Sequence, residues 1–237
     1  MKMTEFVTYG IGLTVLALPA LGDDGDQAAW NFDQDQAGKM PTGWSVRQTN
    51  PSKASATWQV MVDPHAPGKN KILALTRTRN HGSTFNLAVA EHTSFKDLDL
   101  TVKVRAVDGE EDQGGGPIWR CTDENNYYIC RFNPLEGNYR LYVVEEGRRT
   151  QLKSSKVKTR PNQWYTVRVT MTADRITCYL DGKKMLETEN DTFSALGMVG
   201  LWTKADAVTS FDDFQVRQLH TKVKSRPVPA RGRASDP

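Results

Sequence analysis

The chain has 237 residues, of which 38% are hydrophobic and 25% are charged, so it can bury a core as an ordinary soluble globular protein does. One domain is compatible with this length, because all-β sandwiches often reach it. The net charge is only +3, and several of the basic residues fall in the last segment, 221–237. The body is therefore nearly neutral, which excludes the basic surface that a nucleic-acid-binding domain needs.

The N-terminus resembles an export signal. Lys2 precedes an apolar run from Phe6 to Leu18, and small residues followed by an acidic stretch come next. This order is typical of a cleaved signal peptide. We expect residues 1–22 to be removed, 23–29 to be flexible, and the protein to be secreted or periplasmic. A retained N-terminal anchor and a buried core helix are the weaker alternatives, and no stable membrane span is expected in the mature protein.

The rest of the chain predicts strands and almost no helix. Short segments rich in β-branched and aromatic residues alternate with turn signals, which is typical of a sandwich or a barrel. The predicted strands are Thr57–Val62, Ile72–Arg77, Phe85–Ala90, Leu98–Ala106, Gly116–Cys121, Tyr127–Phe132, Tyr139–Glu145, Trp164–Met171, Arg175–Leu180, Lys184–Glu189, Gly197–Thr203 and Phe211–Gln218. They place one domain at 30–218, followed by a disordered basic tail at 219–237.

A turn at Asp123–Asn126 would make a hairpin of the two central strands, with Arg120 opposite Ile129. Alternation along strands then separates two faces. The predicted core face holds Pro117, Trp119, Cys121, Tyr128, Cys130 and Phe132. The other face holds Ile118, Arg120, Thr122, Tyr127, Ile129 and Arg131. This second face is either an ordinary solvated surface or a binding face, because arginine and aromatic side chains suit polyhydroxylated ligands.

Several motifs carry a resemblance to a known family. They are the segment 112–120 (DQGGGPIWR), the segment 123–128 (DENNYY), Leu141-Tyr142, 146–149 (EGRR), 199–206 (VGLWTKAD) and 211–214 (FDDF). Together they resemble the concanavalin-A-like domains grouped with the 3-keto-disaccharide hydrolases, also described as laminin-G-like or family-16-like. The resemblance covers about Trp30 to Gln218. It implies an all-β, concanavalin-A-like jelly-roll sandwich of two antiparallel sheets.

The resemblance also implies a chemistry. A ketone at C3 of a sugar acidifies the C2 proton, so the glycosidic bond can break by proton abstraction and elimination, followed by hydration. One general base and a cation near the enolate oxygen are required. Arg120 and Arg131 could supply the cation. Candidate bases are His81, His92, Glu91 and Asp206, each of which is more often a turn or rim residue, so the catalytic residues stay unassigned.

The predicted working surface consists of Arg120, Tyr127, Arg131, Trp202 and Lys204, facing a saccharide or polysaccharide ligand. Arg120→Ala is then expected to weaken binding or turnover without changing the melting temperature, whereas Trp119→Ala is expected to destabilise the fold. Because this chain departs from the family pattern at two cysteines, a Cys121–Cys130 disulfide is also expected, on the same face of one hairpin of an exported protein.

Three functional classes remain open: an enzyme acting on 3-keto-glycosides, a non-catalytic glycan-binding module, and an interaction domain of the cell envelope. An ordinary two-carboxylate glycosidase is disfavoured, because its only local candidate, Glu187 with Glu189 and Asp191, has the pattern of a solvated strand end. No metal motif or cofactor motif is present. The acidic loop 108–112 could hold calcium, although a solvated loop is the commoner outcome.

Overall fold

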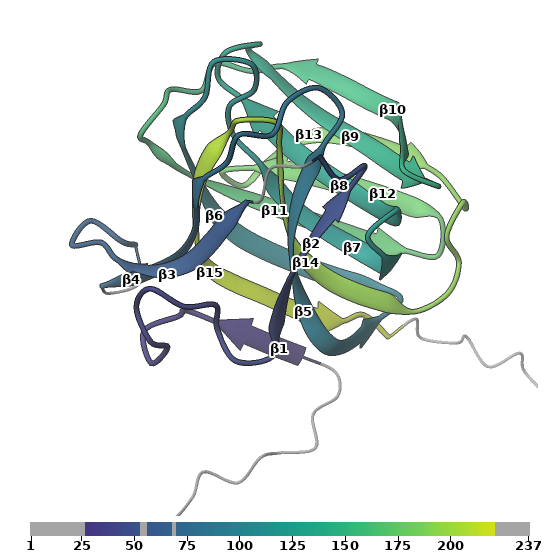
Figure 1. Cartoon of the computed structure of the whole chain (residues 1–237). Coiled ribbons are helices and arrows are strands. Elements are labelled where there is room, and N and C mark those ends of the chain that lie inside the picture. The colour runs from purple at the N-terminus through teal and green to yellow at the C-terminus, as the bar shows by residue number, and fades with distance from the viewer. Residues whose placement is uncertain (1–26, 53–55, 68–69, 221–237) are drawn as a thin grey trace, which may run out of the picture.

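The computed structural model describes residues 27–52, 56–67 and 70–220. The expected signal peptide and nearly all of the expected C-terminal tail lie outside these ranges. The described chain forms two antiparallel sheets stacked as layers (Figure 1). The all-β sandwich expected from the sequence is confirmed. No described helix is long and apolar enough to cross a membrane.

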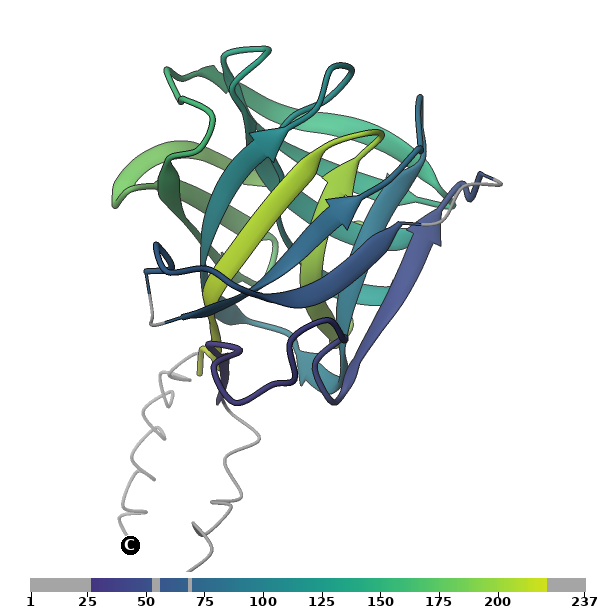
Figure 2. The same cartoon turned by 60° about the vertical axis from the view of Figure 1, so that its left-hand side comes forward.

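The first sheet has the order β13-β12-β11-β6-β15-β4-β3, with the short β1 also pairing with β15. Its strands are β1 (Gln27–Trp30), β3 (Thr57–Val62), β4 (Lys71–Arg77), β6 (Leu98–Asp108), β11 (Trp164–Thr172), β12 (Arg175–Leu180), β13 (Lys183–Glu189) and β15 (Val208–Gln218). The long β15 crosses the middle of this sheet and appears in yellow in Figure 2. Residues 27–29, expected to be flexible, are instead paired in β1, because β4 pairs only with residues 209–211 of β15 and leaves residues 214–217 open to β1.

The second sheet has the order β10-β9-β8-β7-β14-β5-β2. Its strands are β2 (Trp44–Thr49), β5 (Phe85–Phe95), β7 (Gly116–Asp123), β8 (Asn126–Asn133), β9 (Asn138–Glu145), β10 (Arg148–Lys156) and β14 (Gly197–Lys204). The inner face of this sheet packs on the first sheet, and the main core between them contains Trp119, Tyr128, Cys130 and Phe132. These four residues were assigned to the core face from the sequence, and that assignment is confirmed.

The outer face of the second sheet is also buried, which the sequence did not indicate. A second apolar cluster on this face consists of Phe85, Leu87, Val89, Ile118, Cys121, Tyr127, Ile129, Tyr142, Val144 and Trp202. The hydroxyl of Tyr127 on β8 lies 2.8 Å from Oγ1 of Thr49 on β2, although three strands separate β8 from β2. The sheet must therefore curl so strongly that this face is concave and its far corners meet.

A bulge in β7 explains why the pairing register of the hairpin differs from the expected one. The turn pairs Asp123 with Asn126 as predicted, but Ile129 faces Ile118 rather than Arg120. Arg120 has a φ of 46°, a left-handed conformation that is uncommon for a side chain of this size. The extra residues at this bulge return Cys121 to the opposite face from Trp119.

The Cys121–Cys130 disulfide expected from the sequence is wrong for the same reason. Cys121 belongs to the outer cluster and Cys130 to the main core, so the sheet itself separates the two thiols. Cys121, Cys130 and Cys178 are all free and buried. Burial raises the pKa of Cys121 to about 12, so this thiol is a packing group rather than a reactive thiolate.

Candidate functional site

Four of the five residues expected to form an exposed saccharide surface are buried. Arg120 and Arg131 are each 1% exposed, and Tyr127 and Trp202 are fully buried. Only Lys204 keeps part of its side chain in solvent, at 16%. The expectation of one exposed working face is therefore wrong, because the curled sheet encloses the side chains that alternation places there.

Arg120 lies at the far end of the sheet from Lys204 and acts as a clamp. Its guanidinium donates hydrogen bonds to the backbone carbonyls of Lys96, Phe193 and Ala173, and Asp97 Oδ1 lies 3.3 Å away. These partners belong to three separate loops. All three guanidinium nitrogens of this buried cation have protein partners, so Arg120 holds loops together rather than presenting its charge to a ligand.

The other expected residues lie beside a charged cluster at the opposite end of the concave face. We call the charged cluster the set Asp112, Arg131, Glu136, Asn138, Arg140, Tyr142, Arg149 and Lys204. Its members come from the loop before β7 and from β8, β9, β10, β14 and their connections. Arg131 and Lys204 were predicted from the sequence. The remaining six were missed, although Asp112, Tyr142 and Arg149 lie in the motifs that carry the family resemblance.

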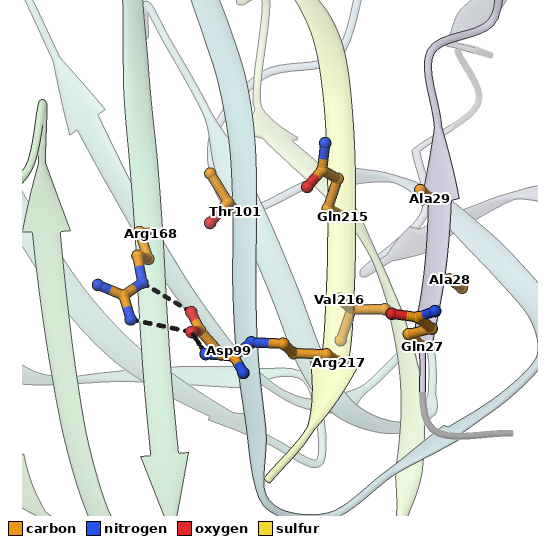
Figure 3. Close-up of a pocket in the computed structure, with 9 residues that line it drawn as sticks. All are labelled: Gln27, Ala28, Ala29, Asp99, Thr101, Arg168, Gln215, Val216 and Arg217. Atoms are coloured by element: carbon orange, nitrogen blue, oxygen red, sulfur yellow. Dashed lines mark hydrogen bonds and ion pairs between the residues drawn. The ribbon is translucent and has the colours of Figure 1, made fainter. Parts of the chain in front are cut away.

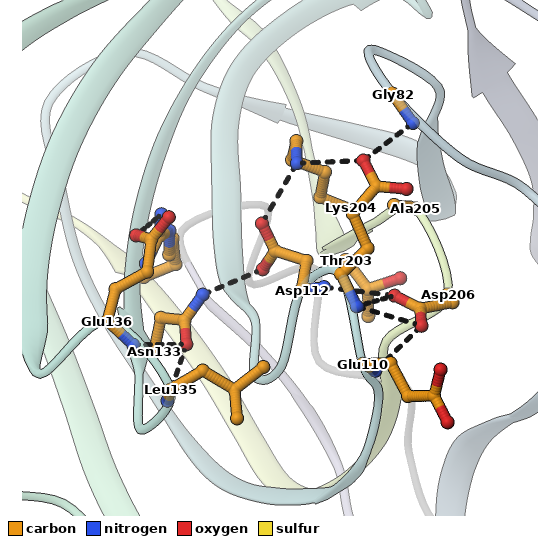
Figure 4. A network of polar contacts seen from close by, with 12 residues as sticks. Gly82, Glu110, Asp112, Asn133, Leu135, Glu136, Thr203, Lys204, Ala205 and Asp206 are labelled. Carbon is orange, nitrogen blue, oxygen red and sulfur yellow. Dashed lines mark hydrogen bonds and ion pairs between the residues drawn. The ribbon is translucent and has the colours of Figure 1, made fainter.

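Asp112 is the most deeply buried carboxylate of the charged cluster. One of its oxygens accepts a hydrogen bond from Asn133 Nδ2 at 3.0 Å, and the other lies 3.2 Å from Lys204 Nζ (Figure 4). Burial raises the pKa of Asp112 above its ordinary value, even though Arg131 and Lys204 oppose the shift. Asp112 is therefore a better proton acceptor than a solvated aspartate.

Asp206 fixes the loop that carries Asp112. Its carboxylate accepts hydrogen bonds from three successive backbone amides, those of Glu110, Glu111 and Asp112, at 2.7–3.1 Å (Figure 4). Burial raises the pKa of Asp206, but the three amides outweigh burial and hold it below its ordinary value. An ionised aspartate used this way is a loop anchor, which argues against the candidate role of Asp206 as a base.

Glu136 binds the two arginines on the other side of the charged cluster. Its Oε2 accepts hydrogen bonds from Arg131 at 2.9 Å, Arg140 at 3.1 Å and Asn138 at 2.8 Å. Burial raises the pKa of Glu136, but the opposite effect of Asn138 and the two guanidinium groups is stronger and lowers this pKa to about 2. Glu136 is consequently a weak proton acceptor and serves to orient Arg131 and Arg140.

Tyr142 connects these polar groups to the aromatic floor. Its hydroxyl accepts hydrogen bonds from Arg131 at 3.3 Å and from Arg140 at 3.4 Å. Its ring lies beneath Arg149, whose guanidinium carbon is 4.4 Å from the centre of the ring. The same guanidinium carbon lies 5.1 Å from the ring centre of Phe85 and 5.6 Å from the ring centre of Trp202. We call Phe85, Tyr142 and Trp202 the aromatic platform.

The other candidate bases lie elsewhere. Glu91 binds Ser45 and Arg47, and His92 follows it, at the far end of β5 from Phe85 and the aromatic platform. His81 is exposed on a loop whose Gly82 amide donates to Glu111. Glu187 pairs with Arg175 and Lys184 on the surface of β12 and β13. In the described ranges, no group of three or more His, Cys, Asp and Glu residues is arranged to hold a metal ion.

A groove on the outer face of the first sheet is a rival location, with a volume of about 520 Å³ (Figure 3). Its one buried carboxylate, Asp99, accepts two hydrogen bonds from Arg168, at 2.7 and 2.9 Å, and one from Arg217 at 2.7 Å. Asp99 thus serves both arginines, and each of the three charged groups has an ion partner within the groove. The charged cluster differs, because it keeps a cation that has no ion pair with any described residue.

Comparison with known proteins supports a carbohydrate-related assignment. Residues 26–217 match the family model described as a 3-keto-alpha-glucoside-1,2-lyase-like domain. No curated protein matches the sequence.

Solved structures with a similar fold include the carbohydrate-binding module CBM66 from Bacillus subtilis, at 21% identity and a TM-score of 0.59, covering 74% of this chain and 96% of the module. The Bacillus licheniformis β-glucanase is similar at 12% identity and a TM-score of 0.56, over 83% of this chain and 99% of the glucanase. At these identities the likeness concerns the fold, a jelly-roll β-sandwich. The match over residues 26–217 establishes that the chain belongs to the family of 3-keto-alpha-glucoside-1,2-lyase-like domains.

Proposed function

We propose that this domain cleaves 3-keto-glycosides by elimination, and that the charged cluster is the site of the reaction. The observation that carries the proposal is the pair of the buried Asp112 and the partly exposed Lys204, 3.2 Å apart, beside Arg131. A carboxylate with a raised pKa next to a partly exposed ammonium supplies one proton acceptor and one cation. These are the two groups that elimination next to a ketone requires.

The reaction divides into three balanced steps. A base removes the proton at C2, and the C2–H electron pair forms an enolate with negative charge on the C3 oxygen. The enolate then re-forms the ketone while the C1–O bond breaks, so that a C1=C2 double bond appears and the leaving alkoxide takes the proton that the base removed from C2. Addition of water across C1=C2 gives the free 3-keto sugar. The ketone provides the acidity, so a second catalytic carboxylate is unnecessary.

We assign the base to Asp112 and the enolate-stabilising cation to Lys204. Glu136 is less suited to act as the base, because a pKa of about 2 leaves little tendency to take a proton from carbon. Lys204 Nζ lies between Asp112 and the more exposed Glu111, which is 3.7 Å away. It can therefore turn toward a ligand oxygen without losing all of its negative partners.

Asp112→Asn tests the assignment. We expect kcat/KM for a 3-keto-disaccharide to fall by roughly 10² or more, since general-base catalysis contributes about this much, while binding of the unoxidised disaccharide stays measurable. The matched control is Asp99→Asn, which removes a buried carboxylate from the outer groove and should leave turnover unchanged. Full turnover by Asp112→Asn would refute the role of Asp112.

A non-catalytic saccharide-binding module is the second candidate, and one observation favours it. Both oxygens of Asp112 already have partners, and the side chain is only 2% exposed, so a substrate proton can reach it only if the cluster rearranges. A binding module would show no turnover of any 3-keto-glycoside by the wild type. It would still lose saccharide affinity in cluster variants such as Arg140→Ala.

We further propose that the protein is exported and that its mature form begins near Asp23. The support is the order of charged, apolar and small residues at the N-terminus. N-terminal sequencing of protein from the medium or the periplasm should begin at or close to Asp23. A soluble protein that still starts at Met1 would contradict export.

A further inference from the structure

Arg149 differs from every other cation of the charged cluster. Arg131 and Arg140 pair with Glu136, and Lys204 pairs with Asp112. Arg149 has no ion pair with any residue of the described ranges, and its Nη1 is buried without a hydrogen-bond partner. Its contacts are with the faces of the aromatic platform.

This arrangement leaves a positive charge only partly compensated. Aromatic faces attract a guanidinium but accept no strong hydrogen bonds, so they replace only part of the lost hydration. Burial lowers the pKa of Arg149, and the nearby Arg131 adds to this effect, although Tyr142 and Asp112 partly oppose it. An anion bound to the free guanidinium edge would compensate the charge.

Space for such an anion exists beside Arg149. A cavity of about 380 Å³ is lined by Asn50, Ser83, Phe85, Gly147, Arg148 and Arg149. Two of these residues are arginines and none is acidic. Asn50 Nδ2 donates to the carbonyls of Ser83 at 3.2 Å and Gly147 at 2.9 Å, so the loops on both sides of the cavity are tied together. The cavity is therefore a built feature with a positive wall.

We propose that this cavity is a subsite for a sugar residue bearing a carboxylate, so that the ligand of the domain is an acidic saccharide. The planar guanidinium of Arg149 matches a carboxylate through two parallel hydrogen bonds. Phe85 also lines the cavity but is 2% exposed, so it offers a small apolar contact to a sugar C–H group rather than an open stacking face. This inference rests on the proposed function, because it names the substrate class of the same site.

Calorimetric titration with methyl β-D-glucuronide and methyl β-D-glucoside tests the subsite, since the two glycosides differ only at C6. We expect the full chain to bind the glucuronide at least roughly tenfold more tightly, as charge-assisted hydrogen bonds typically contribute. Acetate serves as a third ligand and should bind far more weakly than the glucuronide. Equal affinity for acetate would mean that only the anion is recognised and would overturn the sugar subsite.

Arg149→Met should reduce the ratio of the two affinities to about one, whereas Arg217→Met, in the outer groove of the first sheet and away from the cavity, should keep it. If Arg149→Met does not fold, Arg149→Lys retains the charge but loses the bidentate geometry and should retain only a small preference. A preference that survives in full in Arg149→Lys, or that disappears equally in Arg217→Met, would overturn the subsite. These titrations need no turnover, so the subsite can fail while elimination stands, and elimination can fail while the subsite stands.

Discussion

Two arginines of the same sheet, one buried and one partly buried, show opposite uses of a guanidinium group. Arg120, in the bulge of β7, donates to three loop carbonyls and contacts Asp97. Arg149, at the start of β10, lies on three aromatic rings with one nitrogen buried and unpartnered. The sequence favours Arg120 as a ligand-binding residue, but the structure makes it a clamp and leaves Arg149 available.

The difference shows that hydrogen-bond partners, rather than residue type or strand face, indicate which arginine can bind a ligand. Substituting an arginine whose guanidinium nitrogens are all hydrogen-bonded within the protein lowers the stability of the fold. A guanidinium without hydrogen-bond partners has donors available for a ligand, and its substitution costs little folding stability. Substituting both arginines with the same residue is therefore the most direct comparison of the two.

The largest expected effect belongs to Arg120→Met. It removes the hydrogen bonds to Lys96, Phe193 and Ala173 and the contact with Asp97, and the loss of such buried charged contacts costs about 3–5 kcal/mol. Urea unfolding should show this loss of unfolding free energy, with saccharide affinity unchanged at temperatures where the variant is folded. A loss well below about 1 kcal/mol would contradict the clamp.

Glu136→Gln is expected to have a smaller effect that depends on pH. The folded-state pKa of about 2 lies below the ordinary 4.5, so the ionised side chain stabilises the fold above pH 4.5, and this contribution disappears as the pH falls toward 2. Because the side chain is 40% exposed, screening by solvent reduces its contribution to about 1 kcal/mol. Unfolding free energies of the variant and the wild type should differ at pH 7 and converge near pH 2. A constant difference would show that the charge is not the cause.

The smallest stability effect is expected for Arg149→Met. No hydrogen bond or ion pair of the described residues is lost, and the methionine side chain can keep contact with Tyr142 and Phe85. The unfolding free energy should stay within about 1 kcal/mol of the wild type, or rise, because a partly buried charge without an ion partner disappears. Destabilisation as large as that of Arg120→Met would show that Arg149 is also a clamp.

The sequence predicted the fold in more detail than the site. The boundaries of β3 and β12 are as expected, because their apolar residues alternate clearly. β10 escaped prediction since RRTQLKSSK has almost no apolar residue, and its strand depends on pairing with β9. The loop 108–112 and β10 are far apart in the chain, so no local pattern could show that Asp112 and Arg149 share one site.

The bulge at Arg120 is the second limit of prediction. Alternation correctly separated Trp119 from Ile118, but it assumes a strand pairing without a bulge. Gly197 packs so closely on the backbone of Arg120 that a Cβ added to Gly197 would lie 2.5 Å from the carbonyl carbon of Arg120. Because Gly197 has no side chain, β14 can approach this closely and the bulge fits beside it. Such an approach is a tertiary feature, and residues 116–126 alone do not contain it.

A crystal structure of the complex with methyl β-D-glucuronide tests the central claim most directly, namely that the charged cluster holds the saccharide. The account predicts that the sugar lies beside Phe85 and that the sugar carboxylate binds the guanidinium of Arg149. Lys204 should lie within hydrogen-bond reach of a hydroxyl group of the sugar ring. Sugar bound in the outer groove at Asp99, with the cavity at Arg149 empty, would contradict it.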